Sequence, residues 1–194
     1  MAEIDYATSG GSGGSDGASG DKRPTKDEIA KMHFTDKHLY GAGKNPHAQD
    51  VGQDSLGDCF FIATLGAVAE HQPDRIKDMI KYDPKKDTFT VTLYQDKGGK
   101  MTPVSIEVTQ AEIRDNIMRG GGSRVDNGGD KYPVWPAVVE TAYAKMNDPN
   151  PKNGLKEGYQ VLDKGGKAYN AIVTITGEKG ENITRDNVEK KGEQ

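Results

Sequence analysis

The sequence contains only one cysteine, Cys59, among its 194 residues. A single thiol excludes an internal disulfide and a zinc site made of several thiolates, and it is typical of a reducing cytosol. Long hydrophobic runs are lacking too, because the longest weakly polar stretch, Cys59 to Ala69, is shorter than the roughly 20 residues that cross a bilayer. No basic and then apolar segment follows Met1, so no secretory signal is expected. These absences predict no membrane span, and a protein that is cytoplasmic or exported without a classical signal peptide.

The chain also lacks a strong excess of charge of either sign. It has 26 Lys and Arg against 30 Asp and Glu, a net charge of -4. The two signs are intermixed, so no basic stripe is available to neutralise phosphates, and nucleic acid is not expected as a partner. A hydrophobic content of 33% and a mean hydropathy of -0.80 predict one small core, with part of the chain unfolded.

Composition divides the chain into three segments. The stretch from Thr8 to Gly20 is almost entirely Gly, Ser, Ala and Asp, which cannot bury enough apolar surface to offset chain entropy. Residues 1–24 are therefore expected to form a flexible tail, and the polar residues 178–194 a disordered C-terminal end. The domain between them, residues 25–177, is predicted to begin with a capping box formed by Thr25 and Glu28.

Hydrophobic periodicity within this domain predicts a mainly helical α+β fold. Apolar residues recur at helical spacing in three stretches, and one stretch alternates with period two on both sides of a Gly-Gly turn. A second Gly-rich stretch is expected to be a surface loop. The predicted elements are helices at 59–70, 74–82 and 135–147, a β-hairpin at 88–108, a loop at 120–129, and a helical or mixed segment at 168–175.

The stretch QDSLGDCFF, residues 53–61, places Cys59 at the start of the first of these helices, with Asp58 as a candidate N-cap. Unpaired backbone N–H groups and the helix dipole favour a thiolate at such a position. The amide of Gln53 and the backbone N–H of Cys59 could form a two-donor oxyanion hole, and Gly57 leaves room for close approach. Position and spacing alone also allow Cys59 to be a small hydrophobic core residue.

Three ordered blocks resemble the calpain family of papain-like cysteine proteases. QDSLGDCFFIATL is similar to the family's active-site segment, in which Gln and any two residues precede Leu-Gly-Asp-Cys and an aromatic residue. The other two blocks are Trp135 to Lys145, and Gly158 to Asp163 with Gly165, Gly166 and Thr176-Gly177. Together they span about Asp50 to Gly177.

The resemblance implies the N-terminal, cysteine-bearing lobe of a papain-like protease core and a calpain-like cysteine endopeptidase that acts on proteins or peptides. Cys59 matches the nucleophile and Gln53 the oxyanion-hole glutamine, while Gly57, Asp58 and Trp135 are expected to contribute to the binding site. The resemblance therefore implies that this chain carries the nucleophile of the catalytic site, Cys59, and one oxyanion-hole residue, Gln53.

The histidine side of the site is missing from the matched blocks. A papain-type thiol needs a histidine base and an Asn or Asp that orients it, and the family carries both downstream of the cysteine lobe. All four histidines, His33, His38, His47 and His71, lie at or before residue 71, and a competing alignment would place Lys167 at the family's histidine. We therefore expect either a peptidase that depends on a second lobe, or a catalytically inactive binding or effector module.

Calcium is a possible cofactor by resemblance only. Asp50 stands three residues before Gln53, where animal members of the family have a calcium-binding Asp. The partner Glu of those members is replaced by Pro133, and the nearest carboxylate is Asp130. Because Ca²⁺ requires several oxygen ligands, Asp50 could equally be a solvated side chain. No cofactor follows with certainty from the sequence.

Overall fold

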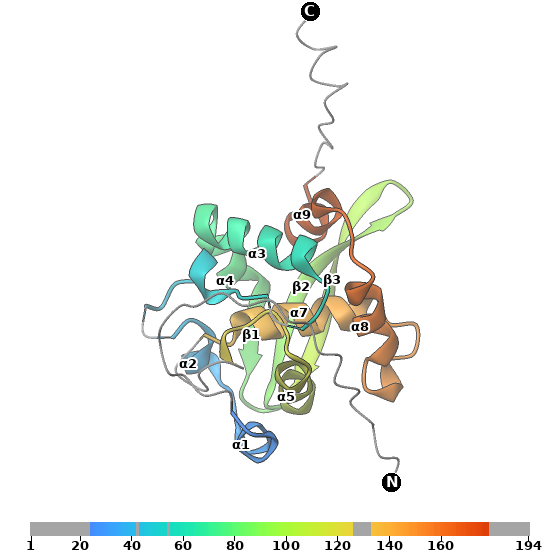
Figure 1. The fold of residues 1–194 in the computed structure, drawn as a ribbon. Helices are drawn as coiled ribbons and strands as arrows, with labels where there is room; N and C mark the ends of the chain where they lie inside the picture. Colours follow the sequence, from blue (N-terminus) through green and yellow to red (C-terminus); the bar gives the residue numbers. More distant parts are fainter. Residues whose placement is uncertain (1–23, 42, 54, 126–132, 179–194) are drawn as a thin grey trace, which may run out of the picture.

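The computed structural model describes residues 24–41, 43–53, 55–125 and 133–178, and these residues are mainly helical (Figure 1). The helices are α1 (Lys26–Lys31), α2 (Asp36–Leu39), α3 (Cys59–His71), α4 (Pro73–Met79), α5 (Gln110–Arg119), α7 (Trp135–Met146), α8 (Lys156–Asp163) and α9 (Ala168–Thr176), with 3-10 turns η1 (Ala48–Asp50) and η3 (Pro151–Asn153). One small antiparallel sheet accompanies them, so the predicted α+β class is confirmed. Except for Pro24 and Glu178, the expected tails 1–24 and 178–194 lie outside the described residues.

The sheet has three strands in the order β1 (Ile80–Asp83), β2 (Thr88–Lys97) and β3 (Lys100–Thr109). The β2–β3 hairpin confirms the prediction, and its turn is Gly98-Gly99 between the paired residues Lys97 and Lys100. Both glycines have positive φ, 68° and 87°, as a tight hairpin turn requires. The alternating apolar residues of β2, such as Val91 and Leu93, are buried and turn one face of the sheet toward the helices.

The predicted helix at 74–82 was too long. Helix α4 ends at Met79, and the next four residues form β1, in which Ile80 pairs with Val91 and Tyr82 with Phe89. Ile80 and Met79 are buried in either conformation, so their spacing fitted a helix equally well. Pairing with a strand already present in the sheet decided the outcome, and pairing of this kind cannot be recognised from local periodicity.

Helix α7 is the centre of the fold. Every residue from Trp135 to Ala144 is buried, and the helix contacts α3, α5, α8 and both long strands of the sheet. Figure 1 shows α7 crossing the middle of the molecule below α3. Tyr143 joins the two helices, with its ring centroid 4.3 Å from that of Phe61. The predicted helices at 135–147 and 59–70 are both confirmed, and none of the described helices is long and apolar enough to cross a membrane.

The Gly-rich segment after α5 is not a surface loop in its described part. Gly120 to Ser123 are buried, while residues 126–132 lie outside the described residues. A Cβ atom on Gly121 would lie 2.3 Å from Asn116 Oδ1, and one on Gly122 would lie 2.0 Å from Ile62 Cδ1. These glycines therefore allow the segment to pack directly against α5 and α3, a role that their composition alone did not indicate.

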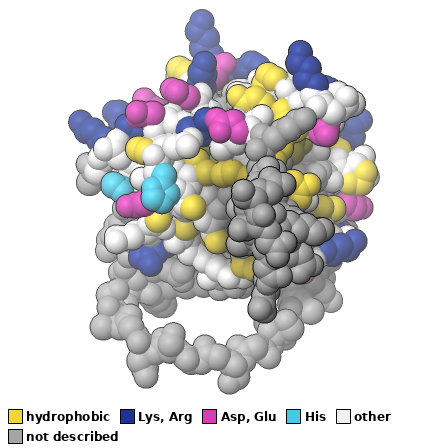
Figure 2. Space-filling view, turned by 90° about the horizontal axis from the view of Figure 1, so that it is seen from above, with side chains coloured by type: hydrophobic (Ala, Val, Ile, Leu, Met, Phe, Trp, Pro, Cys, Tyr) yellow, Lys and Arg dark blue, Asp and Glu magenta, His cyan; other side chains and the backbone are white. Residues whose placement is uncertain are grey.

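Acidic, basic and apolar side chains share the surface above α3 and α9. On the face in Figure 2, Lys and Arg side chains lie among Asp and Glu side chains, with hydrophobic side chains nearer the middle. Tyr169, on α9, is 39% exposed. The surface beside the start of α3 is therefore mixed in character, with some apolar area open to solvent.

We predict that Gly122→Ala destabilises the fold. The added methyl group would overlap the Ile62 side chain, and overpacking of this kind costs about 1–3 kcal/mol of unfolding free energy. Gly43→Ala is the matched control, because a Cβ there meets nothing within 4 Å. Urea denaturation followed by circular dichroism measures both variants, and equal stabilities would contradict the packing described for the segment.

Candidate active site

Cys59 is the first residue of α3, and its side chain is exposed. The helix begins there because the carbonyl of Asp58 accepts the N–H groups of Phe61 and Ile62, at 2.7 and 3.1 Å. Phe61 and Leu65 are fully buried and fix the inner side of the helix. The thiol thus lies at the solvent-facing start of an anchored helix, near the positive end of its dipole.

Asp58 occupies the predicted N-cap position, but its side chain makes no capping hydrogen bond to α3. The residue is 1% exposed, so its carboxyl group lies in the protein interior. The backbone carbonyl alone receives the first N–H groups of the helix. The side chain is therefore free of the helix, and its neighbour is the carboxyl group of Glu140 on α7.

The loop that carries Gln53 is held by backbone hydrogen bonds to the Gly-rich segment. Gly52 N donates to the carbonyl of Gly122 at 2.9 Å, and Ser55 N donates to that of Gly120 at 3.1 Å. The Gln53 side chain is exposed, and its Nε2 donates to the Leu56 carbonyl at 3.4 Å, a long hydrogen bond. The structure thus fixes the backbone of this loop firmly and its amide side chain weakly.

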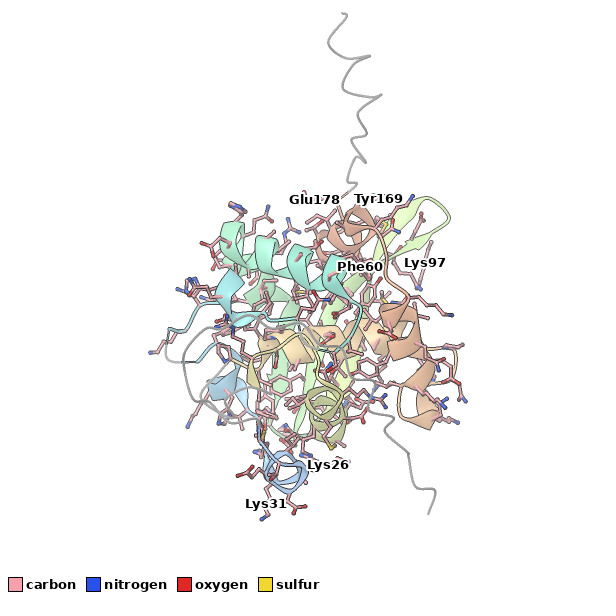
Figure 3. The ribbon with its side chains drawn as sticks, viewed as in Figure 1. Lys26, Lys31, Phe60, Lys97, Tyr169 and Glu178 are labelled. Carbon is pink, nitrogen blue, oxygen red and sulfur yellow. The ribbon has the colours of Figure 1, made fainter. Side chains whose placement is uncertain are left out.

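Gly57 lies at a close contact between this loop and α8. Its N–H donates to Asp163 Oδ1 at 2.9 Å, and a Cβ at this position would be 2.7 Å from the Asp163 carbonyl oxygen. Gly166 makes a similar contact with Phe60, whose Cε2 would be 2.7 Å from an added Cβ. Phe60 and Tyr169 lie near the starts of α3 and α9, on the same side of the molecule (Figure 3). Two glycines therefore let neighbouring segments approach the start of α3.

Trp135 and Asp50 are brought together by the fold. The indole Nε1 of Trp135 donates to Asp50 Oδ2 at 2.8 Å, and the same oxygen accepts the His47 N–H at 2.8 Å. Trp135 is fully buried at the start of α7. The bond ties the η1 turn, three residues before Gln53, to the central helix. The predicted binding role of Trp135 stays a prediction.

The donor groups around Asp50 do not match a calcium site. One carboxylate oxygen already accepts two N–H groups, and Pro133 offers no side-chain oxygen. Across the described ranges, no three His, Cys, Asp or Glu side chains are grouped to hold a metal ion. We therefore assign no chemical step to calcium, and the metal role of Asp50 stays a prediction from the resemblance.

Three of the four histidines, His33, His38 and His71, are bonded elsewhere or distant from the thiol. His33 Nε2 bonds to the Asp87 carboxylate at 2.9 Å, and His38 Nδ1 accepts the Thr35 N–H at 3.0 Å. His71 is the last residue of α3, so at about 1.5 Å per residue it lies roughly 18 Å along the helix from Cys59. Within the described part of the chain, no histidine is hydrogen-bonded to Cys59.

A buried polar cluster lies behind the start of α3, and the sequence analysis did not identify it. Glu140 Oε2 accepts Asn116 Nδ2 at 2.9 Å and the Gly122 N–H at 2.8 Å. Asn116 Nδ2 also donates to the hydroxyl of Tyr159 at 3.1 Å. The available signal was an acidic residue in the middle of an otherwise apolar helix, since charged residues are almost never fully buried unless they have partners.

Burial dominates the electrostatics of this cluster. It raises the pKa of Glu140 well above its ordinary value of 4.5, and the neighbouring Asp58 carboxyl group raises it further. Burial also raises the pKa of Asp58, and that of the Tyr159 phenol. The protonated form is therefore favoured most strongly at Glu140, behind an exposed cysteine.

We predict that Trp135→Phe lowers the unfolding free energy by about 2 kcal/mol, because it removes the N–H that bonds to a half-buried carboxylate. Asp50→Asn retains an acceptor oxygen and should cost clearly less. Thermal unfolding of the two variants and the native protein measures the difference. An equal loss in both variants would show that the indole hydrogen bond adds nothing to stability.

Comparison with known proteins identifies relatives of this chain. Residues 22–193 match the family described as Calpain family cysteine protease. The chain is 28% identical over 159 residues to "Calpain-type cysteine protease DEK1" of Arabidopsis thaliana, an alignment that covers 81% of this chain. The same alignment covers 6% of that relative, so the chain spans a small part of its length. The match over nearly the whole chain shows that this protein belongs to the calpain family of cysteine proteases.

Proposed function

We propose that residues 25–177 form the cysteine-bearing lobe of a calpain-type endopeptidase, with Cys59 as the nucleophile that attacks peptide bonds. The observation that carries this proposal is the exposed thiol on the first residue of an otherwise anchored helix. Family membership supplies the reaction class, the hydrolysis of protein substrates. Gly57 and Gly166 support the role because they let α8 and Phe60 pack closely around the start of α3, which holds the thiol in place.

In the proposed reaction a histidine removes the thiol proton and the sulfur attacks the scissile carbonyl carbon. The C–S bond forms, and the carbonyl oxygen becomes an oxyanion. The Cys59 backbone N–H and the Gln53 amide would stabilise that oxyanion as two hydrogen-bond donors. Gln53 is exposed and holds only a long bond to Leu56, so its amide is available to turn toward the substrate.

The same histidine then gives its proton to the leaving nitrogen as the C–N bond breaks, which leaves a thioester on Cys59. It next takes a proton from water, whose oxygen attacks the thioester carbonyl; the C–S bond breaks, the acid product leaves, and the Cys59 sulfur regains the proton. Because no histidine of the described residues is hydrogen-bonded to Cys59, we propose that this base comes from a second lobe. The mixed surface beside the start of α3, including the exposed Tyr169, is where such a lobe or the substrate would lie.

The second candidate function is an inactive calpain-like module that binds a partner. It is favoured by the positions of His33, His38 and His71, none of which is hydrogen-bonded to Cys59 in the described chain. In this case the exposed thiol would be a remnant of the family's chemistry. The two candidates differ in the reactivity of the thiol, which can be measured without any hydrolysis.

We predict that iodoacetamide alkylates Cys59 at pH 6 to 7 faster than it alkylates a free thiol, because the exposed sulfur lies at the positive end of the α3 dipole. Mass spectrometry of timed samples gives the rate, and Cys59→Ser is the control for labelling at other residues. The urea-unfolded protein supplies the reference rate for the same thiol without the helix. Equal rates for the native and unfolded chains would favour the inactive module.

We predict that this chain alone does not cleave a fluorogenic peptide, and that fusing a calpain histidine-bearing lobe after Gln194 produces cleavage. In the fusion, Cys59→Ala should abolish activity. Gln53→Ala should lower kcat by about 10²–10³-fold with little change in KM, because it removes one oxyanion donor. Full activity in Gln53→Ala would contradict its oxyanion role, and activity in Cys59→Ala would contradict the proposed nucleophile.

A further inference from the structure

Two buried carboxyl groups meet directly behind the nucleophile. Asp58 precedes Cys59 and is 1% exposed, and Glu140 on α7 is fully buried. The two carboxyl groups lie close enough for each to shift the pKa of the other. Nothing in the reaction described above uses this contact.

The hydrogen-bond pattern leaves one oxygen of each group without a donor. Glu140 Oε2 accepts from Asn116 and from the Gly122 N–H, whereas Glu140 Oε1 and Asp58 Oδ2 meet no N–H or O–H donor in the part of the chain that the structure describes. Buried polar atoms are nearly always paired, since an unpaired one costs free energy. A single proton placed between the two carboxyl groups satisfies both oxygens at once.

Among the described residues, no cation neutralises the pair instead. Neither carboxyl group forms an ion pair with any Lys, Arg or His side chain of the described residues. The charged and titratable groups beside the pair are Asp163 and Tyr159 on α8. Asp115 and Arg119 on α5 lie next, against Tyr159. The Arg119 guanidinium lies over the Tyr159 ring, 4.8 Å from its centroid, and bonds to Asp115 at 2.7 Å. These neighbours add negative rather than positive field, which disfavours two ionised carboxylates.

We propose that Asp58 and Glu140 share one proton, and that this carboxyl–carboxylate hydrogen bond is a positioning device for Cys59 and Gln53. The relevance to catalysis rests on the function proposed above, whereas the shared proton does not. Glu140 holds the proton and donates it from Oε1, because it is the more deeply enclosed of the two. Asp58 carries the negative charge, which the start of α3 favours.

The bond connects both halves of the nucleophile site. Glu140 bonds on one side to Asp58, the neighbour of Cys59, and on the other to Gly122. The Gly122 carbonyl in turn accepts the N–H of Gly52, the residue before Gln53. One buried side chain thus sets the distance between the nucleophile and the oxyanion donor through the backbone.

The pH dependence follows from the protonated pair. Glu140 binds a proton in the folded chain at pH values where the unfolded chain, with an ordinary value near 4.5, has released it. The contribution of this pair to stability is therefore full at low pH and is lost as pH rises from about 4.5 through the raised pKa, by up to tenfold in the unfolding constant per pH unit. Loss of the proton places two like charges in a buried site and pushes the start of α3 away from α7.

The first test is a pH titration of the full chain with ¹³C-labelled Asp and Glu carboxyl groups, observed by NMR. We expect one carboxyl group, absent from the spectrum of Glu140→Gln, to remain protonated well above pH 4.5. Glu70→Gln, the same change on the exposed side of α3, should leave that signal in place. A Glu140 carboxyl group that ionises near pH 4.5 would overturn the shared proton.

The second test compares unfolding constants as a function of pH. Glu140→Gln keeps a donor for Asp58 and an acceptor for Gly122 but cannot ionise. Its unfolding constant should therefore rise less steeply with pH than that of the native chain, and the two slopes should differ by up to tenfold per pH unit. The unfolding constant of Glu70→Gln should follow that of the native chain. Parallel curves for all three proteins would refute the proposal. If Glu140→Gln does not fold, Asp58→Asn serves instead. In Asp58→Asn the NMR signal of the Glu140 carboxyl group should titrate at a lower pH than in the native chain. An unchanged titration of that signal would contradict the shared proton.

The positioning role has its own readout, the rate at which iodoacetamide alkylates Cys59. The alkylation rate of the native chain divided by that of Glu140→Gln should change as pH passes the midpoint of the Glu140 titration observed by NMR. The rate of the native chain divided by that of Glu70→Gln should stay constant. A native to Glu140→Gln ratio that is constant across the midpoint would leave the proton shared but remove its link to Cys59. None of these measurements requires hydrolysis, so a failed peptidase proposal and a failed pair can be told apart.

Discussion

The packing of the Gly120–Ser123 segment against two helices and the cysteine loop is the constraint on which the site depends. Its backbone bonds to Gly52 and Ser55 fix the path of the loop that ends at Cys59. The segment can approach only because Gly121 and Gly122 have no side chains, and its N–H at Gly122 is satisfied by Glu140. The position of the nucleophile therefore depends on three successive contacts. Buried Glu140 holds the Gly120–Ser123 segment, and this segment holds the loop that ends at Cys59.

Much of the fold was predictable because its elements are locally encoded. The apolar spacing of α3 and α7 and the Gly-Gly turn of the β2–β3 hairpin all indicated the elements that form. Strand β1 was mistaken for the end of a helix, since Ile80 is buried in either conformation and only its pairing with Val91 distinguishes them. The Gly-rich segment was assigned to the surface because composition reports flexibility and not close packing.

The residues of the candidate site could be predicted from a local motif, but the contacts that hold them could not. Cys59 at the start of a helix and Gln53 six residues earlier followed from QDSLGDCFF and its family resemblance. The links that hold them were hidden, because they join residues far apart in sequence. Trp135 reaches Asp50 across 85 positions, and Asp58 reaches Glu140 across the core. Local sequence cannot report such pairs, although an acid inside an apolar helix was a warning that a partner existed.

Trp135 is the only tryptophan in the chain, and the fold places it against Asp50, close in sequence to Gln53. Its fluorescence therefore comes from a single indole whose N–H is bonded to a carboxylate of the η1 turn. Any event that moves this turn, such as the arrival of a substrate, a metal ion or another protein lobe, alters the surroundings of that one ring. The molecule thus contains its own optical reporter, and ligands can be sought by emission alone without a label or a substrate.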